Sequence, residues 1–211
     1  MIVNQPTGLK DLIVLLADKD AEFSMQGILA NPLRLGIRNI TFKVVADRQG
    51  KDPGVFRKCH DVLRSSLRLY DHALVVFDRD GCGRQENREA LELETENRLA
   101  QNGWHDRCAA VVMDPELEVW VWSESPHVPE VLGWSSTAAE LTRTLEHAGY
   151  LEPGHTKPHN PKDALDHVLR LSNKRHSSAL FLELAQKVSF ESCKDPAFLK
   201  LKATLQKWFA R

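Results

Sequence analysis

The sequence feature that most constrains the fold is the stretch Ala73–Gly83, which reads ALVVFDRDGCG. Five apolar residues, Ala73–Phe77, are followed at once by Asp78, Arg79, Asp80 and a glycine-rich turn. An unbroken apolar run of this length is typical of a strand buried on both faces, as in a parallel sheet. The sequence therefore predicts a central parallel strand with charged residues at its carboxyl end.

Asp78 and Asp80 stand where open parallel sheets bind ligands, beyond the carboxyl end of a strand. Side chains two apart on an extended segment point the same way, so both carboxylates are expected to face one ion. Mg²⁺ is usually held by one or two carboxylates together with substrate phosphates. The alternative interpretation is a strand that ends in a polar turn, because aspartate and glycine are common turn residues.

Further apolar runs predict three more strands, with helical patterns between them. The predicted strands cover 11–17, 40–46 and 108–113. One predicted helix follows Asp20, which we take as its N-cap. Two more predicted helices cover 54–69 and 86–102. Alternation of buried strands with helices of ordinary length predicts an α/β, Rossmann-like, mostly parallel sheet with helices on both faces.

The second part of the chain is predicted to be helical. A capping box at Thr137 opens a helix that ends near Gly149, and a proline-rich stretch at 152–161 is the best linker candidate. Three helical segments are expected after it, over 162–171, 177–188 and 197–209. The predicted division is an α/β domain over 1–150 and a C-terminal helical extension over 151–211 packed on it.

Two structures compete for the segment from Asp114 to Trp120. Glu116 and Glu118 alternate with apolar residues, which is strand-like. Asp114 as N-cap with Pro115 at the first helical position forms a good helix start, and we favour a helix there. In either case both glutamates lie beyond a strand that is expected to neighbour the central one.

Composition describes an ordinary globular chain of 211 residues with 42% apolar and 27% charged residues. No apolar stretch is long enough to span a membrane, and the first ten residues do not resemble a secretory signal. The four cysteines are scattered, which argues against a disulfide framework or zinc cluster. A reducing, cytoplasmic setting is therefore expected.

Net charge is −1, but the charges are unevenly distributed. Residues 150–211 carry 11 basic and 6 acidic residues, whereas the part before them carries 17 and 23. An acidic front with a basic tail suits a metal site beside a phosphate-binding surface, although the charge distribution alone favours a solvated helical surface. No nucleophile elbow, Walker loop or dinucleotide fingerprint occurs, which disfavours those enzyme classes.

The order of these features resembles a Toprim (topoisomerase–primase) domain, in which Asp78 and Asp80 match the DxD pair. The closer resemblance is to small Toprim relatives in bacterial defence loci, the RloB-like and related families. They carry a Pro-Glu-x-Glu-x-Trp type of segment, here 115–120, in which Glu118 matches the glutamate before the tryptophan. They also have a helical stretch with a lysine, to which Asn173-Lys174 and 195–198 are similar. The small Toprim-like component of methylation-associated anti-phage defence systems is the nearest of these.

The resemblance implies metal-assisted phosphoryl transfer, with Mg²⁺ or Mn²⁺ as cofactor. Each role is assigned by the resemblance and listed as follows: Asp78, Asp80 and Glu118 as metal ligands, Asp18 and Glu116 as outer ligands or proton-transfer groups, Lys19 as a phosphate contact, and Lys174 and Arg175 as nucleic-acid contacts. The implied partners are nucleic acid and other subunits of a defence complex, with homo-oligomers possible and no membrane.

One position departs from the family pattern and leaves two rival functions open. The glutamate expected after the first strand falls on Ala17, with Asp18 one residue later. The first rival is therefore a catalytically degenerate subunit that binds partner proteins as a scaffold. The second is a receiver-like phosphoacceptor domain, against which the paired aspartates argue because that class uses a lone acceptor aspartate.

Overall fold

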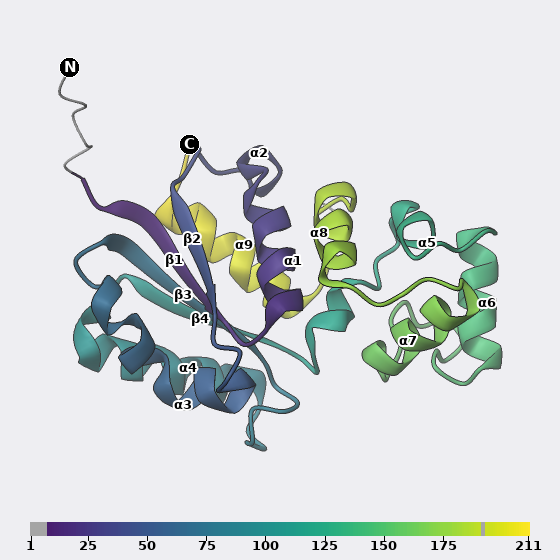
Figure 1. Cartoon of the computed structure of the whole chain (residues 1–211), viewed down its shortest axis with the longest axis horizontal. Helices are drawn as coiled ribbons and strands as arrows, with labels where there is room; N and C mark the ends of the chain where they lie inside the picture. The colour runs from purple at the N-terminus through teal and green to yellow at the C-terminus, as the bar shows by residue number, and fades with distance from the viewer. Residues whose placement is uncertain (1–7, 191–192) are drawn as a thin grey trace.

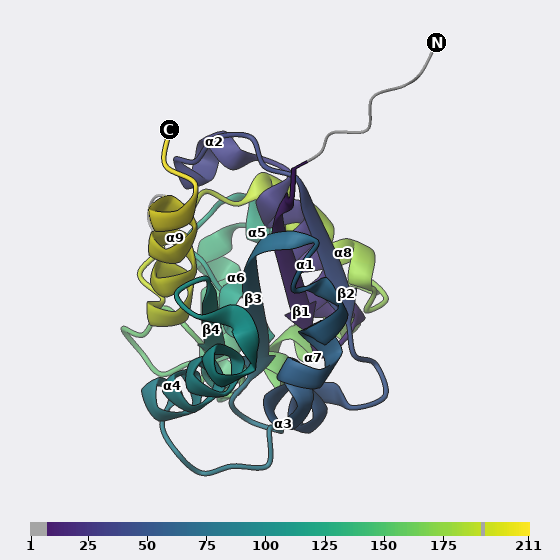
Figure 2. The same ribbon diagram turned by 90° about the vertical axis from the view of Figure 1, so that its left-hand side faces the viewer.

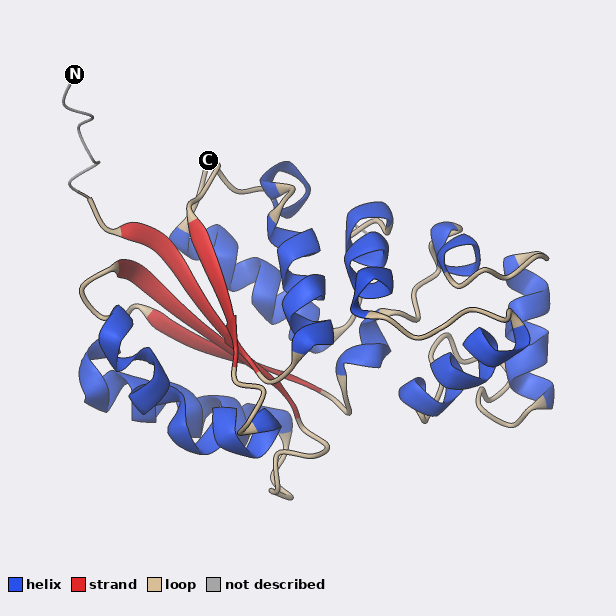
Figure 3. Cartoon of the chain, viewed as in Figure 1, coloured by secondary structure: helices blue, strands red, loops and turns tan. Residues whose placement is uncertain are grey.

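The fold is built on a parallel β-sheet, shown in red in Figure 3. The computed structural model describes residues 8–190 and 193–211, so the predicted absence of a leader at 1–7 lies outside the described residues. Within them, β1 (Lys10–Leu16), β2 (Phe42–Ala46), β3 (Tyr70–Asp78) and β4 (Cys108–Met113) form a four-stranded sheet. The strand order is β2-β1-β3-β4 and every pairing is parallel. The predicted α/β, Rossmann-like fold is confirmed.

The central strands are buried on both faces, as their unbroken apolar runs predict. Along β1, Leu12 and Val14 face one hydrophobic cluster, while Ile13 and Leu15 face the other. This alternation follows from the two-residue period of a strand. Helices must therefore cover both faces of the sheet.

Two pairs of helices provide that cover (Figures 1 and 2). The first face carries α1 (Lys19–Leu29) and α9 (Pro196–Trp208), whose buried side chains join the cluster of Leu12 and Val14. The second face carries α3 (Lys51–Leu63) and α4 (Arg88–Leu99), which join the cluster of Ile13 and Leu15. Because α3 connects β2 to β3, its first turn lies at the carboxyl edge of the sheet.

The predicted C-terminal helices are present, and they pack in different places. They are α7 (Pro161–Leu171), α8 (Ser178–Lys187) and α9. Helix α8 packs against α1, and α9 returns to the sheet beside β4. Helices α5 (His127–Val131), α6 (Ala138–His147) and α7 lie farthest from the sheet in Figure 1. The helices after 150 thus share the hydrophobic core with the sheet, and the boundary at 150 stays a prediction.

The short elements complete the path of the chain. They are the helix α2 (Pro32–Leu35), the 3₁₀ turns η1 (Arg64–Ser66) and η3 (Leu117–Trp120), and the π-helical turn η2 (Ala100–Trp104). Over the residues that the structure describes, no helix is long and apolar enough to span a membrane.

The β4 edge of the sheet is closed by side chains of α4. Glu92 Oε1 accepts the backbone N–H of Val112 at 3.0 Å, and Glu96 Oε1 accepts that of Ala110 at 3.0 Å. Lys200 of α9 donates to both glutamates, at 3.1 and 2.7 Å. An open strand edge invites pairing with another chain, so these contacts protect β4 while tying α4 to α9.

Two local predictions are wrong. Asp18, not Asp20, is the N-cap of α1, because β1 ends at Leu16 and leaves Asp18 in an extended conformation where Oδ1 accepts the N–H of Ala21 at 2.9 Å. No α-helix begins at Pro115, because its carbonyl accepts the N–H of Asp80 at 2.9 Å and is committed outside any helix. The chain there forms only the 3₁₀ turn η3.

Candidate functional site

Asp78 is the residue around which the candidate site is organised. It is the last residue of β3, and its backbone N–H donates to Asp52 Oδ1 at 2.9 Å. Its own Oδ1 is buried and has no hydrogen-bond partner among the described residues. Burial raises the pKa of the Asp78 carboxyl well above its usual value, and the neighbouring carboxylate of Asp52 adds to the effect. The charge of Glu118 raises this pKa further.

Asp52 joins the site from the first turn of α3. Burial is the main cause that raises the pKa of its carboxyl, and the hydrogen bond from Asp78 opposes the rise. Sequence reasoning missed Asp52, because the predicted helix over 54–69 begins after this residue, whereas α3 begins at Lys51. The usable signal was an aspartate in the short segment between a predicted strand and the next predicted helix, at the same sheet edge as Asp78.

Glu118, in η3, and Glu116, the extended residue just before it, enter the site beyond the end of β4. The Glu118 side chain is only 5% exposed, and burial together with the charge of Glu116 raises its pKa to about 7. Glu116 Oε1 accepts the backbone N–H of Lys162 at 3.0 Å. The structure therefore brings both predicted glutamates to the same edge as Asp78, as parallel strand ends require.

Lys162 supplies positive charge to this acidic edge. It is the second residue of α7 and was not singled out from the sequence. Burial lowers the pKa of its ammonium, but the carboxylates of Glu118 and Glu116 more than compensate, so the pKa is raised overall. Such coupling places the ammonium in the field of the carboxylate group.

Asp18 and Lys19 lie at the start of α1, after β1, and both are exposed. The charge of Asp18 contributes to the raised pKa of Asp78, so it borders the site. Asp18 is already used as the N-cap. The Lys19 ammonium lies 5.5 Å from the centre of the Phe23 ring. The predicted role of Lys19 as a phosphate contact stays a prediction.

Asp80 is placed differently from Asp78. Strand β3 ends at Asp78, so the two-residue alternation that was expected to align the two carboxylates does not continue. The Asp80 side chain is 62% exposed, and its Oδ1 lies 3.8 Å from Arg79 Nε. Asp78 is half-buried with its Oδ1 fully buried, whereas Asp80 faces solvent.

Lys174 and Arg175 follow α7. The Lys174 ammonium donates to the carbonyl of Val131 at the end of α5, which gives this lysine a structural contact. Arg175 is exposed. Next to them, His176 Nε2 lies 2.9 Å from Asp20 Oδ2 and its Nδ1 lies 3.3 Å from Asp166 Oδ1. This histidine links α7 to the start of α1.

Carboxylate oxygens are suitable ligands for a hard divalent cation, but the carboxylates of this site do not surround a cation on all sides. Among residues 8–190 and 193–211, no group of three or more histidine, cysteine, aspartate or glutamate side chains is arranged to hold a metal ion. Mg²⁺ needs only one or two carboxylates when water and phosphate oxygens supply the rest. The buried, unpartnered Oδ1 of Asp78 fits a ligand of this kind.

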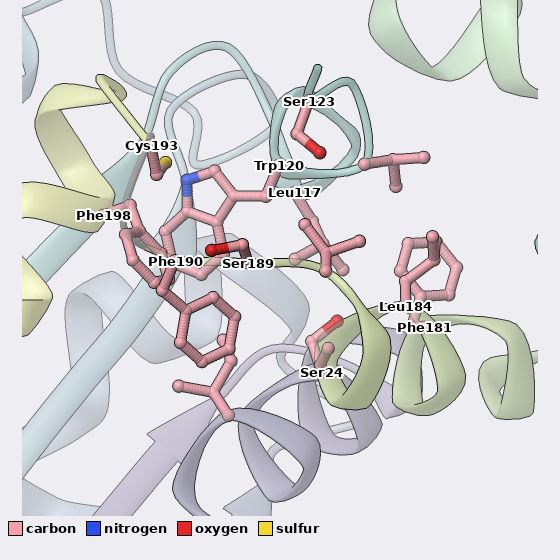
Figure 4. Close-up of a pocket in the computed structure, with 14 residues that line it drawn as sticks. Ser24, Leu117, Trp120, Ser123, Phe181, Leu184, Ser189, Phe190, Cys193 and Phe198 are labelled. Carbon is pink, nitrogen blue, oxygen red and sulfur yellow. The ribbon is translucent and has the colours of Figure 1, made fainter. Parts of the chain in front are cut away.

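The turn that carries Glu118 is anchored by Trp120. The indole N–H donates to Asp195 Oδ1 at 2.9 Å, and the ring packs edge-on against Phe198 at 5.5 Å. Figure 4 shows Trp120 beside an apolar pocket between η3, α1 and α8. Other residues that line the pocket are Leu117, Phe181, Leu184, Phe190 and Cys193. Trp120 thereby holds η3 between the apolar pocket and the acidic site.

Comparison with known proteins gives no match: no protein-family model, curated protein or solved structure is significantly similar to this chain. The class that the fold itself defines is a Rossmann-like α/β protein. Its distinguishing feature is a cluster of carboxylates at the carboxyl edge of a parallel sheet.

Proposed function

We propose that this chain binds a divalent cation, Mg²⁺ or Mn²⁺, at the carboxylates around Asp78 and performs phosphoryl transfer on nucleic acid, as a metal-dependent nuclease of an anti-phage defence system. The observation that carries the proposal is the buried Oδ1 of Asp78, which has no hydrogen-bond partner in the described part of the chain. An isolated buried carboxylate is costly unless it is paired or binds a metal. The defence role is supported by the motif order in the sequence alone.

The expected role of each residue in the site follows from its charge. A bound divalent cation would offset the negative charge of a phosphate. Asp78 and Glu118 would hold the ion at the end of the sheet. Lys162 offers an ammonium to a phosphate oxygen beside them. Without a metal, burial and the charge of Glu116 raise the pKa of Glu118 to about 7, and a bound cation would favour its charged form.

Cleavage assays test this function. Labelled DNA and RNA, single- and double-stranded, are incubated with the purified chain and Mn²⁺ or Mg²⁺, with a chelator as a parallel arm. We expect cation-dependent cleavage that falls at least about a hundredfold in Asp78→Asn, because a charge-stabilising group in the site is lost. The matched control is Asp61→Asn, since Asp61 is 56% exposed and pairs with Arg64. Activity that survives in Asp78→Asn or in chelator contradicts the proposal.

The degenerate-subunit function has one observation in its favour. Ala17 stands where the resemblance expects a glutamate, and its side chain is buried in the cluster with Ile13 and Leu15. Asp18 is engaged as a helix cap instead. This function predicts that Asp78→Asn leaves phage resistance intact in cells that carry the complete defence locus. Loss of resistance in Asp78→Asn, with Asp61→Asn unaffected, excludes it.

A further inference from the structure

The position of Asp52 follows from the crossover between β2 and β3. The strand order is β2-β1-β3-β4, so α3 must pass over β1 to connect β2 with β3. Its first turn begins just after β2, at the carboxyl edge of the sheet, and Asp52 is its second residue. Topology therefore places a carboxylate from this helix beside the end of β3, where Asp78 stands.

The contact between the two residues is direct. Asp52 Oδ1 accepts the backbone N–H of Asp78 at 2.9 Å, which turns the Asp52 side chain toward the sheet. Asp52 Oδ2 faces the turn after β3, since a Cβ added at Gly81 would lie 3.9 Å from it. Gly81 has a φ of +97°, a conformation that glycine adopts without strain, so this turn passes close to Asp52.

A second observation points to a ligand at this place. Asp78 Oδ1 is buried and unpartnered within the described residues, so one acceptor in the site lacks a donor or a cation. The charge of Asp78 contributes to the raised pKa of Lys162, but no hydrogen bond joins the two side chains in the described structure. Two adjacent carboxylates with an open acceptor suit a cation held by a pair of oxygens and completed by water.

We propose that Asp52, and not Asp80, is the carboxylate that shares a bound divalent cation with Asp78. The inference rests on the proposed function, because it assumes that the acidic site binds a cation. Asp80 is unsuited to this role: its side chain is 62% exposed beyond the end of the strand, next to Arg79. Asp52 thus takes the place that the sequence motif gives to Asp80.

The test compares two matched Asp→Asn variants by Mn²⁺ titration calorimetry. Asp52→Asn keeps an oxygen that can accept the Asp78 N–H, and Asp80→Asn makes the same chemical change on the exposed side of the turn. We expect Mn²⁺ affinity to fall at least about tenfold in Asp52→Asn and to stay within about twofold of wild type in Asp80→Asn. Thermal unfolding of each variant confirms that it is folded.

The outcomes separate this inference from the proposed function. Asp52→Asn binding like wild type, or Asp80→Asn losing at least as much affinity, overturns the role of Asp52 while the cation site stands. A wild-type chain that does not bind Mn²⁺ overturns both. Asp52→Ser serves as a second neutral variant if Asp52→Asn does not fold.

Discussion

Single residues at the acidic edge carry an electrostatic cost that the rest of the fold must offset. Asp78, Asp52 and Glu118 all have raised pKa values, and burial is the first cause in each case. A raised pKa means that the folded chain holds the neutral acid more favourably than the unfolded chain does. The metal-free protein is therefore expected to lose stability as these carboxyl groups ionise.

Glu118 makes this cost measurable through pH. Its ordinary pKa is 4.5 and its pKa in the folded chain is about 7. Its stabilising contribution is fully present below pH 4.5 and is lost as pH rises through about 7, a change of roughly 3 kcal/mol. We expect Glu118→Gln to become more stable than wild type over this range. Denaturant unfolding in chelator at several pH values checks this, and parallel pH profiles for the two proteins would contradict it.

The sequence predicts the residues at strand ends better than those that arrive from helices. Asp78, Glu116 and Glu118 were predicted to lie near one another because parallel strands end at one edge. Asp52 was missed because its place depends on β2 lying on the far side of β1, an order that local patterns do not encode. Lys162 follows a proline-rich stretch, and only tertiary packing brings it to the glutamates.

Buried polar contacts between elements hold η3, the turn that carries Glu118, in place. Asp195 is 6% exposed, caps α9 by accepting the N–H groups of Ala197 and Phe198, and accepts the indole N–H of Trp120. Its other oxygen accepts Lys157 Nζ at 2.9 Å. Three separate segments therefore meet at one carboxylate: η3, the proline-rich stretch and α9.

Replacing Asp195 tests this junction at the level of elements. Asp195→Ala removes the cap and leaves Lys157 and Trp120 without their acceptor, so we expect a loss of about 3 kcal/mol in unfolding free energy. Asp195→Asn keeps one acceptor oxygen for the cap and the indole, and it is expected to lose less. Denaturant unfolding compares the two. Equal losses would contradict the assigned hydrogen bonds and leave the charge as the only contribution.

The pKa of Asp195 gives the same junction a pH dependence of opposite sign. Burial alone would raise this pKa, but the hydrogen bond and charge of Lys157 outweigh it, and the pKa is lowered overall. A lowered pKa stabilises the fold above the ordinary value of 3.8 and loses that contribution as pH falls through the folded value. Low pH therefore weakens the contacts through which Asp195 holds η3. The same change removes the unfavourable charge of the buried carboxyl groups in the site.

At the scale of the whole molecule, the strand order explains why one edge of the sheet gathers so much charge. The ends of β1, β3 and β4 and the start of α3 all meet there, and each contributes a carboxylate. The apolar core lies between the sheet and the helices that cover both of its faces (Figure 1). The fold was predictable from its apolar runs, whereas the return of α9 to the sheet depends on long-range packing that the sequence pattern does not specify.

Mn²⁺ titration calorimetry of wild type and Asp78→Asn shows whether the carboxylates around Asp78 form the divalent-cation site that we propose. We expect saturable binding by wild type and by the Asp61→Asn control, and a loss of affinity of at least about tenfold in Asp78→Asn. No saturable binding by wild type, or equal binding by wild type and Asp78→Asn, would contradict the claim.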